Sequence, residues 1–129
     1  MNRRHLLGIY GEVVGLAILG IWTMLLVTDQ VPELETAPLT IYYHLVAEFL
    51  TAIALLVTGT GLLAKRNWAF RGYLAALGML LYTVINSAGY YADLGESSMV
   101  GMFAFLTVTT IACLWITLRS DAFVSNELK

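Results

Sequence analysis

The sequence predicts an all-α integral membrane protein in which residues 1–129 form a single domain, an antiparallel four-helix bundle. Composition is the first observation behind this prediction. Of the 129 residues, 59% are hydrophobic, a larger share than soluble domains usually have. The second observation is that the apolar residues form four stretches, each long enough to cross roughly 30 Å of hydrocarbon as a helix. These stretches lie at about residues 6–28, 40–64, 69–91 and 99–118.

The third observation is the distribution of charge. All seven basic residues fall in segments that would share one side of the membrane: Arg3, Arg4, Lys65, Arg66, Arg71, Arg119 and Lys129. The two segments on the other side contain only acidic charges: Asp29, Glu33, Glu35, Asp93 and Glu96. Because cytoplasmic loops are rich in Lys and Arg, we expect a plasma-membrane protein with both termini in the cytoplasm. So few and dispersed basic residues also argue against a nucleic-acid partner.

The first stretch carries three glycines near one face. Gly8, Gly11 and Gly15 have a spacing that lets another helix approach closely, and that helix could belong to this chain or to a partner. The apolar run is too long for the core of a typical signal peptide, and no small-residue cleavage site follows it. We therefore expect this segment to remain as the first membrane helix.

Short polar connections separate the other stretches. An outer loop at residues 29–39 contains two prolines, which interrupt helix. A basic turn at residues 65–68 ends the second stretch, and so short a turn makes the second and third helices antiparallel neighbours. An outer turn at residues 92–98 leads to the fourth helix. The polar tail at residues 119–129 is expected to be loosely ordered.

Ionisable side chains inside the spans are the candidates for function, because a charge in hydrocarbon is costly and needs a partner or water. His44 and Glu48 are spaced i, i+4 and share a helix face, as do Tyr82 and Asn86 on the third stretch. At about 1.5 Å of rise per residue, His44 and Asn86 both lie roughly 7 Å below the outer boundary. Glu48 and Tyr82 both lie about 13 Å below it. We therefore predict a polar pocket of these four residues in the outer half of the bundle.

Glu12 is a separate candidate, roughly 9 Å from the cytoplasmic boundary. It could bond to a threonine of another helix, or bind a proton or cation on the inner side. The segment Tyr10–Gly15, Tyr-Gly-Glu-Val-Val-Gly, is similar to the first helix of small multidrug-resistance transporters, which are also four-helix proteins of about this length. The resemblance covers six residues and implies proton-coupled drug export with Glu12 as the shared site. The strong charge bias and the His44–Glu48 pair depart from that family's pattern, so we do not assign the chain to it.

These observations lead to three functional hypotheses. In the first, the outer pocket binds a small or amphiphilic ligand with coupled protonation of His44 and Glu48, and transport of that ligand is left open. In the second, the protein is a structural or accessory subunit that docks through the face formed by Gly8, Gly11 and Gly15. In the third, it is a component of a quinone or haem oxidoreductase, although the usual redox ligands are missing.

The sequence does not identify a cofactor. His44 and Glu48 supply two possible metal ligands from one helix, fewer than a zinc site needs, so we expect no metal. Catalytic triads, phosphate-binding loops and paired cysteines are missing from the sequence, so we favour a protein that is not an enzyme. The expected partners are the lipid bilayer, a hydrophobic or amphiphilic small molecule, and further copies of this chain or other subunits.

Overall fold

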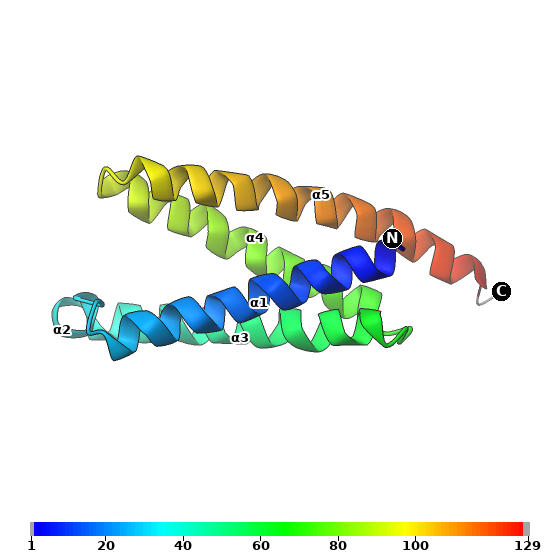
Figure 1. Cartoon of the computed structure of the whole chain (residues 1–129), viewed down its shortest axis with the longest axis horizontal. Helices are drawn as coiled ribbons and strands as arrows, with labels where there is room; N and C mark the ends of the chain where they lie inside the picture. The colour runs from blue at the N-terminus through cyan, green and yellow to red at the C-terminus, as the bar shows by residue number, and fades with distance from the viewer. Residues whose placement is uncertain (1, 128–129) are drawn as a thin grey trace.

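The computed structural model describes residues 2–127, with side chains described for residues 2–120. Within these residues the protein is entirely α-helical and contains no strand. Its elements are α1 (Arg3–Val27), α2 (Glu33–Thr36), α3 (Pro38–Leu63), α4 (Ala69–Asp93) and α5 (Ser97–Glu127) (Figure 1). Four helices are long and apolar enough to cross a membrane: α1, α3, α4 and the Ser97–Ser120 part of α5. The all-α class and the four long apolar helices are thereby confirmed.

The helices begin and end close to the predicted positions, within three residues at every end except the last. Local chemistry accounts for the earlier starts of two of them. The side chain of Asn2 accepts a hydrogen bond from the Arg4 amide at 3.1 Å, and so caps α1. Pro38 occupies the first turn of α3, where its missing amide proton is not needed.

Two predictions about the connecting segments were wrong. The outer loop contains the short helix α2, whose first turn carries Glu33 and Glu35, acidic residues that suit the positive end of a helix dipole. The tail at residues 119–129 was expected to be loose, but α5 continues without a break to Glu127. Extending an existing helix requires no new nucleus, so a polar tail can stay helical where an isolated polar segment would not.

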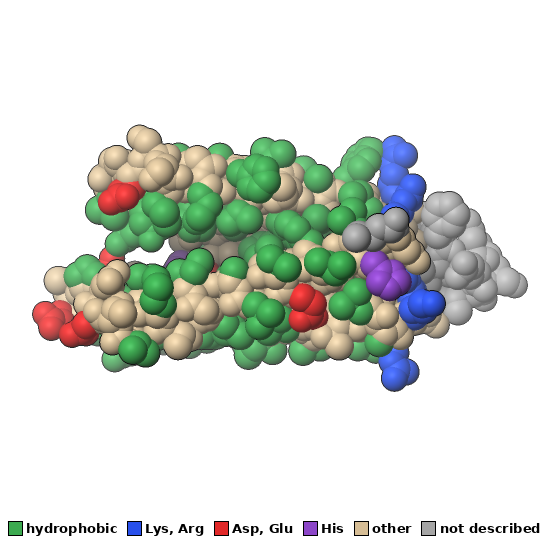
Figure 2. Space-filling view, in the orientation of Figure 1, with side chains coloured by type: hydrophobic (Ala, Val, Ile, Leu, Met, Phe, Trp, Pro, Cys, Tyr) green, Lys and Arg blue, Asp and Glu red, His purple; other side chains and the backbone are tan. Residues whose placement is uncertain are grey.

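The long helices are arranged as two pairs. α1 lies against α3 and α4 lies against α5, while contact between α3 and α4 joins the pairs (Figure 1). The pairs are close together near the α3–α4 turn and separate toward α2 and the α4–α5 turn (Figure 1). Figure 2 shows an opening between them at this second end. Lys and Arg side chains gather at the closed end, hereafter the basic end, and most of the visible Asp and Glu side chains at the open end, hereafter the acidic end (Figure 2).

Glycines allow α1 to pack directly on its neighbours. A Cβ atom added at Gly11 would lie 2.9 Å from the ring of Tyr73 and 3.2 Å from the carbonyl oxygen of Leu55. Added at Gly8 or Gly15, it would come within 2.7 Å or 2.9 Å of an α3 leucine side chain. The glycine face is therefore occupied within the chain, and an accessory subunit would have to dock through another surface.

Two apolar clusters reflect the same arrangement. The larger one joins all four long helices, and its buried members are Leu7, Val14, Leu55, Leu62, Ala69, Phe70, Tyr73, Ala76, Leu77, Leu80, Val84 and Cys113. The smaller one lies at the acidic end, and its buried members are Val31, Ile41 and Leu45. The partly buried residues around this smaller cluster come from α1, α2 and α3, with none from α4 or α5 among the described residues. The acidic end of the α1–α3 pair thus has a core of its own, which allows the second pair to diverge from it.

Candidate functional site

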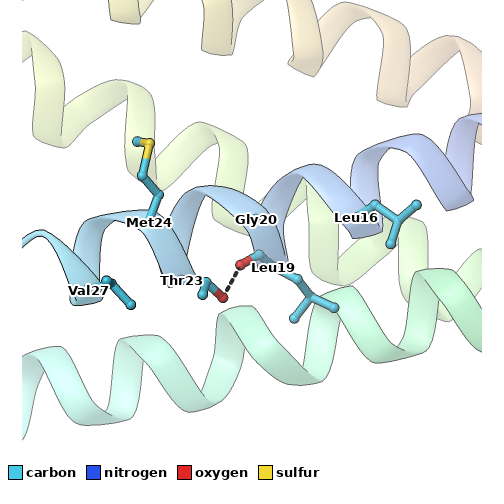
Figure 3. Close-up of a pocket in the computed structure, with 6 residues that line it drawn as sticks. All are labelled: Leu16, Leu19, Gly20, Thr23, Met24 and Val27. Carbon is cyan, nitrogen blue, oxygen red and sulfur yellow. Dashed lines mark hydrogen bonds between the residues drawn. The ribbon is translucent and has the colours of Figure 1, made fainter.

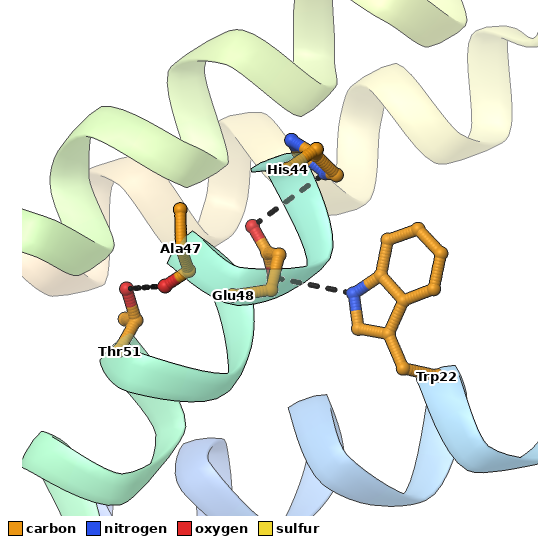
Figure 4. A network of polar contacts seen from close by, with 5 residues as sticks. All are labelled: Trp22, His44, Ala47, Glu48 and Thr51. Atoms are coloured by element: carbon orange, nitrogen blue, oxygen red, sulfur yellow. Dashed lines mark hydrogen bonds and ion pairs between the residues drawn. The ribbon is translucent and has the colours of Figure 1, made fainter. Parts of the chain in front are cut away.

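The polar site lies between α1 and α3, in the half of the bundle toward the acidic end (Figure 4). His44 and Glu48 stand one turn apart on α3, with 3.8 Å between Nε2 of His44 and Oε1 of Glu48. The indole Nε1 of Trp22, on α1, donates a hydrogen bond to Oε2 of Glu48 at 3.3 Å. The rings of Trp22 and His44 also meet edge to face, with 5.6 Å between their centroids. The three side chains form one contiguous group.

The two oxygens of the Glu48 carboxyl group have different surroundings. The residue is only 6% exposed, and Oε2 accepts the Trp22 hydrogen bond. Oε1 is buried and has no hydrogen-bond partner among the residues that the structure describes. His44, whose side chain is 29% exposed, is too distant at 3.8 Å to donate a hydrogen bond to it. Because buried polar atoms are nearly always paired, this oxygen marks a position where a donor is missing.

Neighbouring hydroxyl groups on α3 are not free to fill that position. The side chain of Thr51 donates to the carbonyl oxygen of Ala47 at 2.8 Å, within the same helix (Figure 4). Thr58 donates to Ala54 in the same way at 2.6 Å. Threonine in membrane helices commonly bonds its own backbone. The polar stripe that continues from Glu48 along α3 is therefore internally satisfied, and the unpaired acceptor is confined to Glu48.

The structure brings His44 and Glu48 together but gives them no recorded bond to the α4 residues of the predicted pocket. Tyr82 is 73% exposed and Asn86 is exposed as well. Within the described part of the chain, neither residue forms a hydrogen bond with His44 or Glu48. The grouping of all four residues stays a prediction, and the observed bonding partner of Glu48 is Trp22.

Trp22 was not found by the sequence reasoning, although a signal was present. It lies six residues before the predicted end of the first stretch, which corresponds to about 9 Å of depth. That depth falls between the values for His44 and Glu48. A buried indole N–H needs an acceptor, and a carboxylate at a similar depth is an obvious one. The same depth argument that paired the second and third stretches would have drawn attention to Trp22 on the first.

Glu12 forms a hydrogen bond with a threonine of another helix, as one of the two interpretations of the sequence predicted. The hydroxyl group of Thr60, on α3, donates to Oε1 of Glu12 at 2.7 Å. The same oxygen would lie 3.0 Å from a Cβ atom at Gly59, so the carboxyl group sits directly on the α1–α3 contact. Glu12 is therefore bonded apart from the Trp22–His44–Glu48 group, and no recorded contact connects the two.

Other polar groups in the half toward the basic end are paired with one another. The hydroxyl group of Tyr10 lies 3.0 Å from the hydroxyl groups of both Thr109 and Thr110, which connects α1 to α5. The buried Tyr73 donates to the carbonyl oxygen of Leu7, which connects α4 to α1. These contacts satisfy every group they involve and hold the helix pairs together where the bundle is closed. We assign them a structural role.

One polar contact crosses the acidic end. The hydroxyl group of Tyr90, near the end of α4, donates to the carboxylate of Glu33 in α2. Tyr90 also meets Tyr91 edge to face, with 5.1 Å between ring centroids, and Tyr91 stacks on Phe103 of α5 at 5.6 Å. The contact thus connects the first helix pair, through α2, to the second pair at the end where the bundle opens.

The outer surface of α1 has a shallow apolar depression. Its lining residues are Leu16, Leu19, Gly20, Thr23, Met24 and Val27 (Figure 3). The hydroxyl group of Thr23 donates to the carbonyl oxygen of Leu19 at 2.6 Å, so the single polar side chain of the lining is already bonded. The depression therefore presents no polar side chain that lacks a hydrogen bond. Among the described residues no group of three or more His, Cys, Asp or Glu side chains could hold a metal ion.

The fold and the site define a class: an all-α protein with four helices able to cross a membrane and a buried, incompletely paired carboxyl group. The chain belongs to a family described as a domain of unknown function (DUF8058), whose model matches residues 1–127. No curated protein and no solved structure matches the chain.

Proposed function

We propose that the protein is a plasma-membrane protein of four antiparallel helices that binds a small or amphiphilic ligand at Glu48, with coupled protonation of the His44–Glu48 pair. Transport of the ligand is an extension of this proposal. The charge distribution supports an orientation in which the basic end and both termini face the cytoplasm (Figure 2). In that orientation the opening between the helix pairs faces the outside, and the ligand enters there.

The observation that carries the proposal is the unpartnered Oε1 of Glu48. A carboxyl group placed only to hold helices together gains most when both oxygens are bonded, and an unsatisfied buried acceptor costs about 1–3 kcal/mol. Such a cost is typical of a site whose missing partner is a ligand or a proton. We therefore favour a binding role over a purely structural role for the pair.

Protonation is linked to binding through the same oxygen. In this proposal the carboxyl group carries a proton when the site is empty and releases it when a ligand donates a hydrogen bond to Oε1. His44, at 3.8 Å, is the other titratable group of the site and can take up or release the proton. In this proposal, Tyr82 and Asn86 orient a ligand that extends across the opening toward α4. Glu12, bonded to Thr60, is a second protonation site toward the cytoplasm in a transport cycle.

The test uses purified protein in a polyoxyethylene detergent and a set of decyl-chain amphiphiles whose headgroups are ammonium, trimethylammonium, hydroxyl and sulfate. The shift in unfolding temperature that each amphiphile causes is measured from about pH 8 to about pH 5. We expect at least one member to stabilise the wild type in a pH-dependent way and to lose that dependence in Glu48→Gln. The matched control is Glu35→Gln, which removes an exposed carboxylate of α2. Identical pH profiles for wild type and Glu48→Gln would remove the pair from the mechanism.

A further inference from the structure

We propose that the ligand of this site is an amphiphile with a primary ammonium headgroup, which pairs with Oε1 of Glu48 beside the indole ring of Trp22. This inference rests on the proposed function and names its ligand class. Four features of the site lead to it: the unpaired acceptor, the lack of a permanently charged protein cation, the Trp22 N–H that holds the carboxylate, and the apolar surroundings of the site.

The unpaired acceptor calls for a hydrogen-bond donor. Oε2 is occupied by the Trp22 N–H at 3.3 Å, whereas Oε1 is buried with no partner recorded for it in the described residues. The hydroxyl groups that lie next along α3 are bonded to their own helix. A ligand group that carries N–H or O–H completes the coordination of the carboxylate, and a group without a donor does not.

The lack of a permanently charged protein cation calls for a charged donor. Among the described side chains, no Lys or Arg lies within ion-pair distance of Glu48, and its ion-pair partner His44, at 3.8 Å, is charged only when it is protonated. The Lys and Arg side chains gather at the opposite end of the molecule (Figure 2). While His44 is neutral, the buried carboxylate has no counter-charge, and that state is strongly disfavoured. Acidic residues where α4 ends and α5 begins, Asp93 and Glu96, also give the open end a negative potential that attracts cations.

The two requirements together narrow the choice to an ammonium ion. Trp22 is held beside the carboxylate by its own hydrogen bond and by its edge-to-face contact with His44. Its N–H lies in the ring plane, so the edge of the indole faces Oε2, and the charge of the ligand is met by the carboxylate. A primary ammonium group meets both requirements, because it carries charge and three N–H donors. A quaternary ammonium group supplies charge alone, and a hydroxyl group supplies only a donor.

The surroundings of the opening favour a ligand with an apolar chain. Ile41 and Leu45, on the side of α3 that carries Glu48, are apolar and belong to the smaller cluster, against which Trp22 packs. The opening lies between helix pairs whose outer surfaces are suited to lipid. A ligand with an ammonium headgroup at Glu48 can therefore leave its chain among these apolar side chains or the lipid, where burial of each CH₂ contributes about 0.8 kcal/mol.

The decisive experiment measures equilibrium binding of the four decyl amphiphiles to the wild type, to Glu48→Gln, to Trp22→Phe and to the control Glu35→Gln. We expect decylammonium to bind best to the wild type, with one ligand per chain. Its affinity should fall at least about tenfold in Glu48→Gln, fall less in Trp22→Phe, and change less than about twofold in Glu35→Gln. Decyltrimethylammonium should bind more weakly than decylammonium, and decanol and decyl sulfate should show no dependence on Glu48.

The outcomes separate this inference from the proposal on which it rests. If decanol binds best and still depends on Glu48, the site binds ligands but the ammonium assignment is wrong. If decylammonium binds equally well to wild type and Glu48→Gln, the amphiphile only partitions into the micelle and the inference is overturned. If no headgroup shows dependence on Glu48, the proposed function fails as well.

A measurement on the wild type keeps the test independent of how well the variants fold. Dicyclohexylcarbodiimide, an apolar reagent, reacts with carboxyl groups in apolar surroundings, and mass spectrometry locates the modified residue. Because decylamine can convert the activated carboxyl group to an amide with release of dicyclohexylurea, modification is counted as the N-acylurea and the decylamide together. We expect this total modification of Glu48 to be slowed by decylammonium and unaffected by decyl sulfate at the same concentration. Equal labelling rates with both amphiphiles would contradict the inference.

Discussion

At Glu48 a single side chain combines a stabilising contact with a destabilising one. Oε2 receives the Trp22 hydrogen bond, while Oε1 is buried without a partner in the described part of the chain. Interhelical hydrogen bonds in membranes contribute on average about 0.6 kcal/mol, and an unsatisfied buried acceptor costs about 1–3 kcal/mol. The second effect is larger, so we expect the residue to lower the stability of the empty protein. The sign of this net contribution to stability would distinguish the proposed binding role from a role that only holds helices together.

The difference between these two free-energy contributions predicts that a double substitution at Trp22 and Glu48 is less harmful than the single substitution at Trp22. Trp22→Phe alone removes the donor and leaves both oxygens of Glu48 unpaired, so the free energy of unfolding should fall by about 1 kcal/mol. Trp22→Phe combined with Glu48→Met removes donor and acceptor together, and the double variant should be at least as stable as the wild type. Unfolding in mixed micelles, followed by circular dichroism, measures both changes.

Trp115→Phe is the control for the loss of an indole ring elsewhere in the chain, because Trp115 is exposed and its ring contacts Arg119 through its face. It should change stability by less than about 0.5 kcal/mol. The double variant decides between the two roles. If it is less stable than Trp22→Phe alone, Glu48 serves to hold α1 and α3 together, and the binding role loses its support.

At the scale of the helices, the α1–α3 contact depends on backbones that approach without side chains between them. Gly11 faces the buried Tyr73 and the backbone oxygen of Leu55, whereas Gly20 on the same helix has no atom within 4 Å of its added Cβ. Gly11→Ala should lower the free energy of unfolding by about 1–3 kcal/mol, because the backbone of α3 cannot move aside as a flexible side chain could. Gly20→Ala, the matched control, should leave stability unchanged or raise it slightly.

Both glycine variants are compared with the wild type by the same unfolding measurement. Equal effects at the two positions would show that the close α1–α3 contact does not limit packing. A loss confined to Gly11→Ala would support the α1–α3 contact described above.

The helices themselves could be predicted because their cause is local. A membrane span needs about 20 apolar residues, and that requirement leaves a clear signal in the sequence. The short helix α2 was missed because two prolines in its segment suggested a loop, although Pro32 precedes its first residue and Pro38 follows its last. The continuation of α5 was missed because its tail is polar, and polarity alone does not end a helix.

The site could be predicted only in part, since its remaining features depend on how the helices are placed in space. The i, i+4 spacing was enough to put His44 and Glu48 together, because one helix carries both. The estimated depth in the membrane then identified residues at the same level as His44 and Glu48, among them Asn86 and Trp22. Depth alone could not show which of these residues bonds to Glu48. The choice between them depends on helix rotation and on the divergence of α4 from α3, which no short sequence pattern encodes.

For the molecule as a whole, the Tyr90–Glu33 contact connects the two helix pairs across the acidic end. Tyr90→Phe removes this hydrogen bond and leaves the ring contact with Tyr91 in place. Local opening that breaks this contact should cost about 0.6–1 kcal/mol less in the variant, so the population of the locally opened form should rise about three- to fivefold. The rate of maleimide labelling at Thr51→Cys, a buried position next to Glu48, reports that population in a Cys113→Ala background.

The control for this prediction is Tyr43→Phe, which changes an exposed tyrosine hydroxyl that has no recorded hydrogen bond among the described residues. Its labelling rate should match that of the parent. A Tyr90→Phe rate equal to that of the parent would mean that the contact with α2 does not restrain the opening.

The opposite charges at the two ends of the molecule predict its orientation in the membrane. Alkaline phosphatase, which is active only outside the cytoplasm, should be active when fused after Gly95 and inactive when fused after Arg66 or Lys129. Green fluorescent protein, which fluoresces when folded in the cytoplasm, should give the reverse result.

The physical cause of the orientation is testable as well, because orientation follows the count of Lys and Arg in short loops and depends little on Asp and Glu. Neutralising Lys65, Arg66 and Arg71 with Gln should therefore weaken the orientation, and adding Glu33→Lys and Glu35→Lys should produce mixed or inverted insertion. Neutralising Glu33 and Glu35 with Gln, which adds no basic residue, should leave the reporters as in the wild type. An active phosphatase fused at the C-terminus of the unmodified chain would place the opening at Glu48 on the cytoplasmic side and reverse the direction from which its ligand enters.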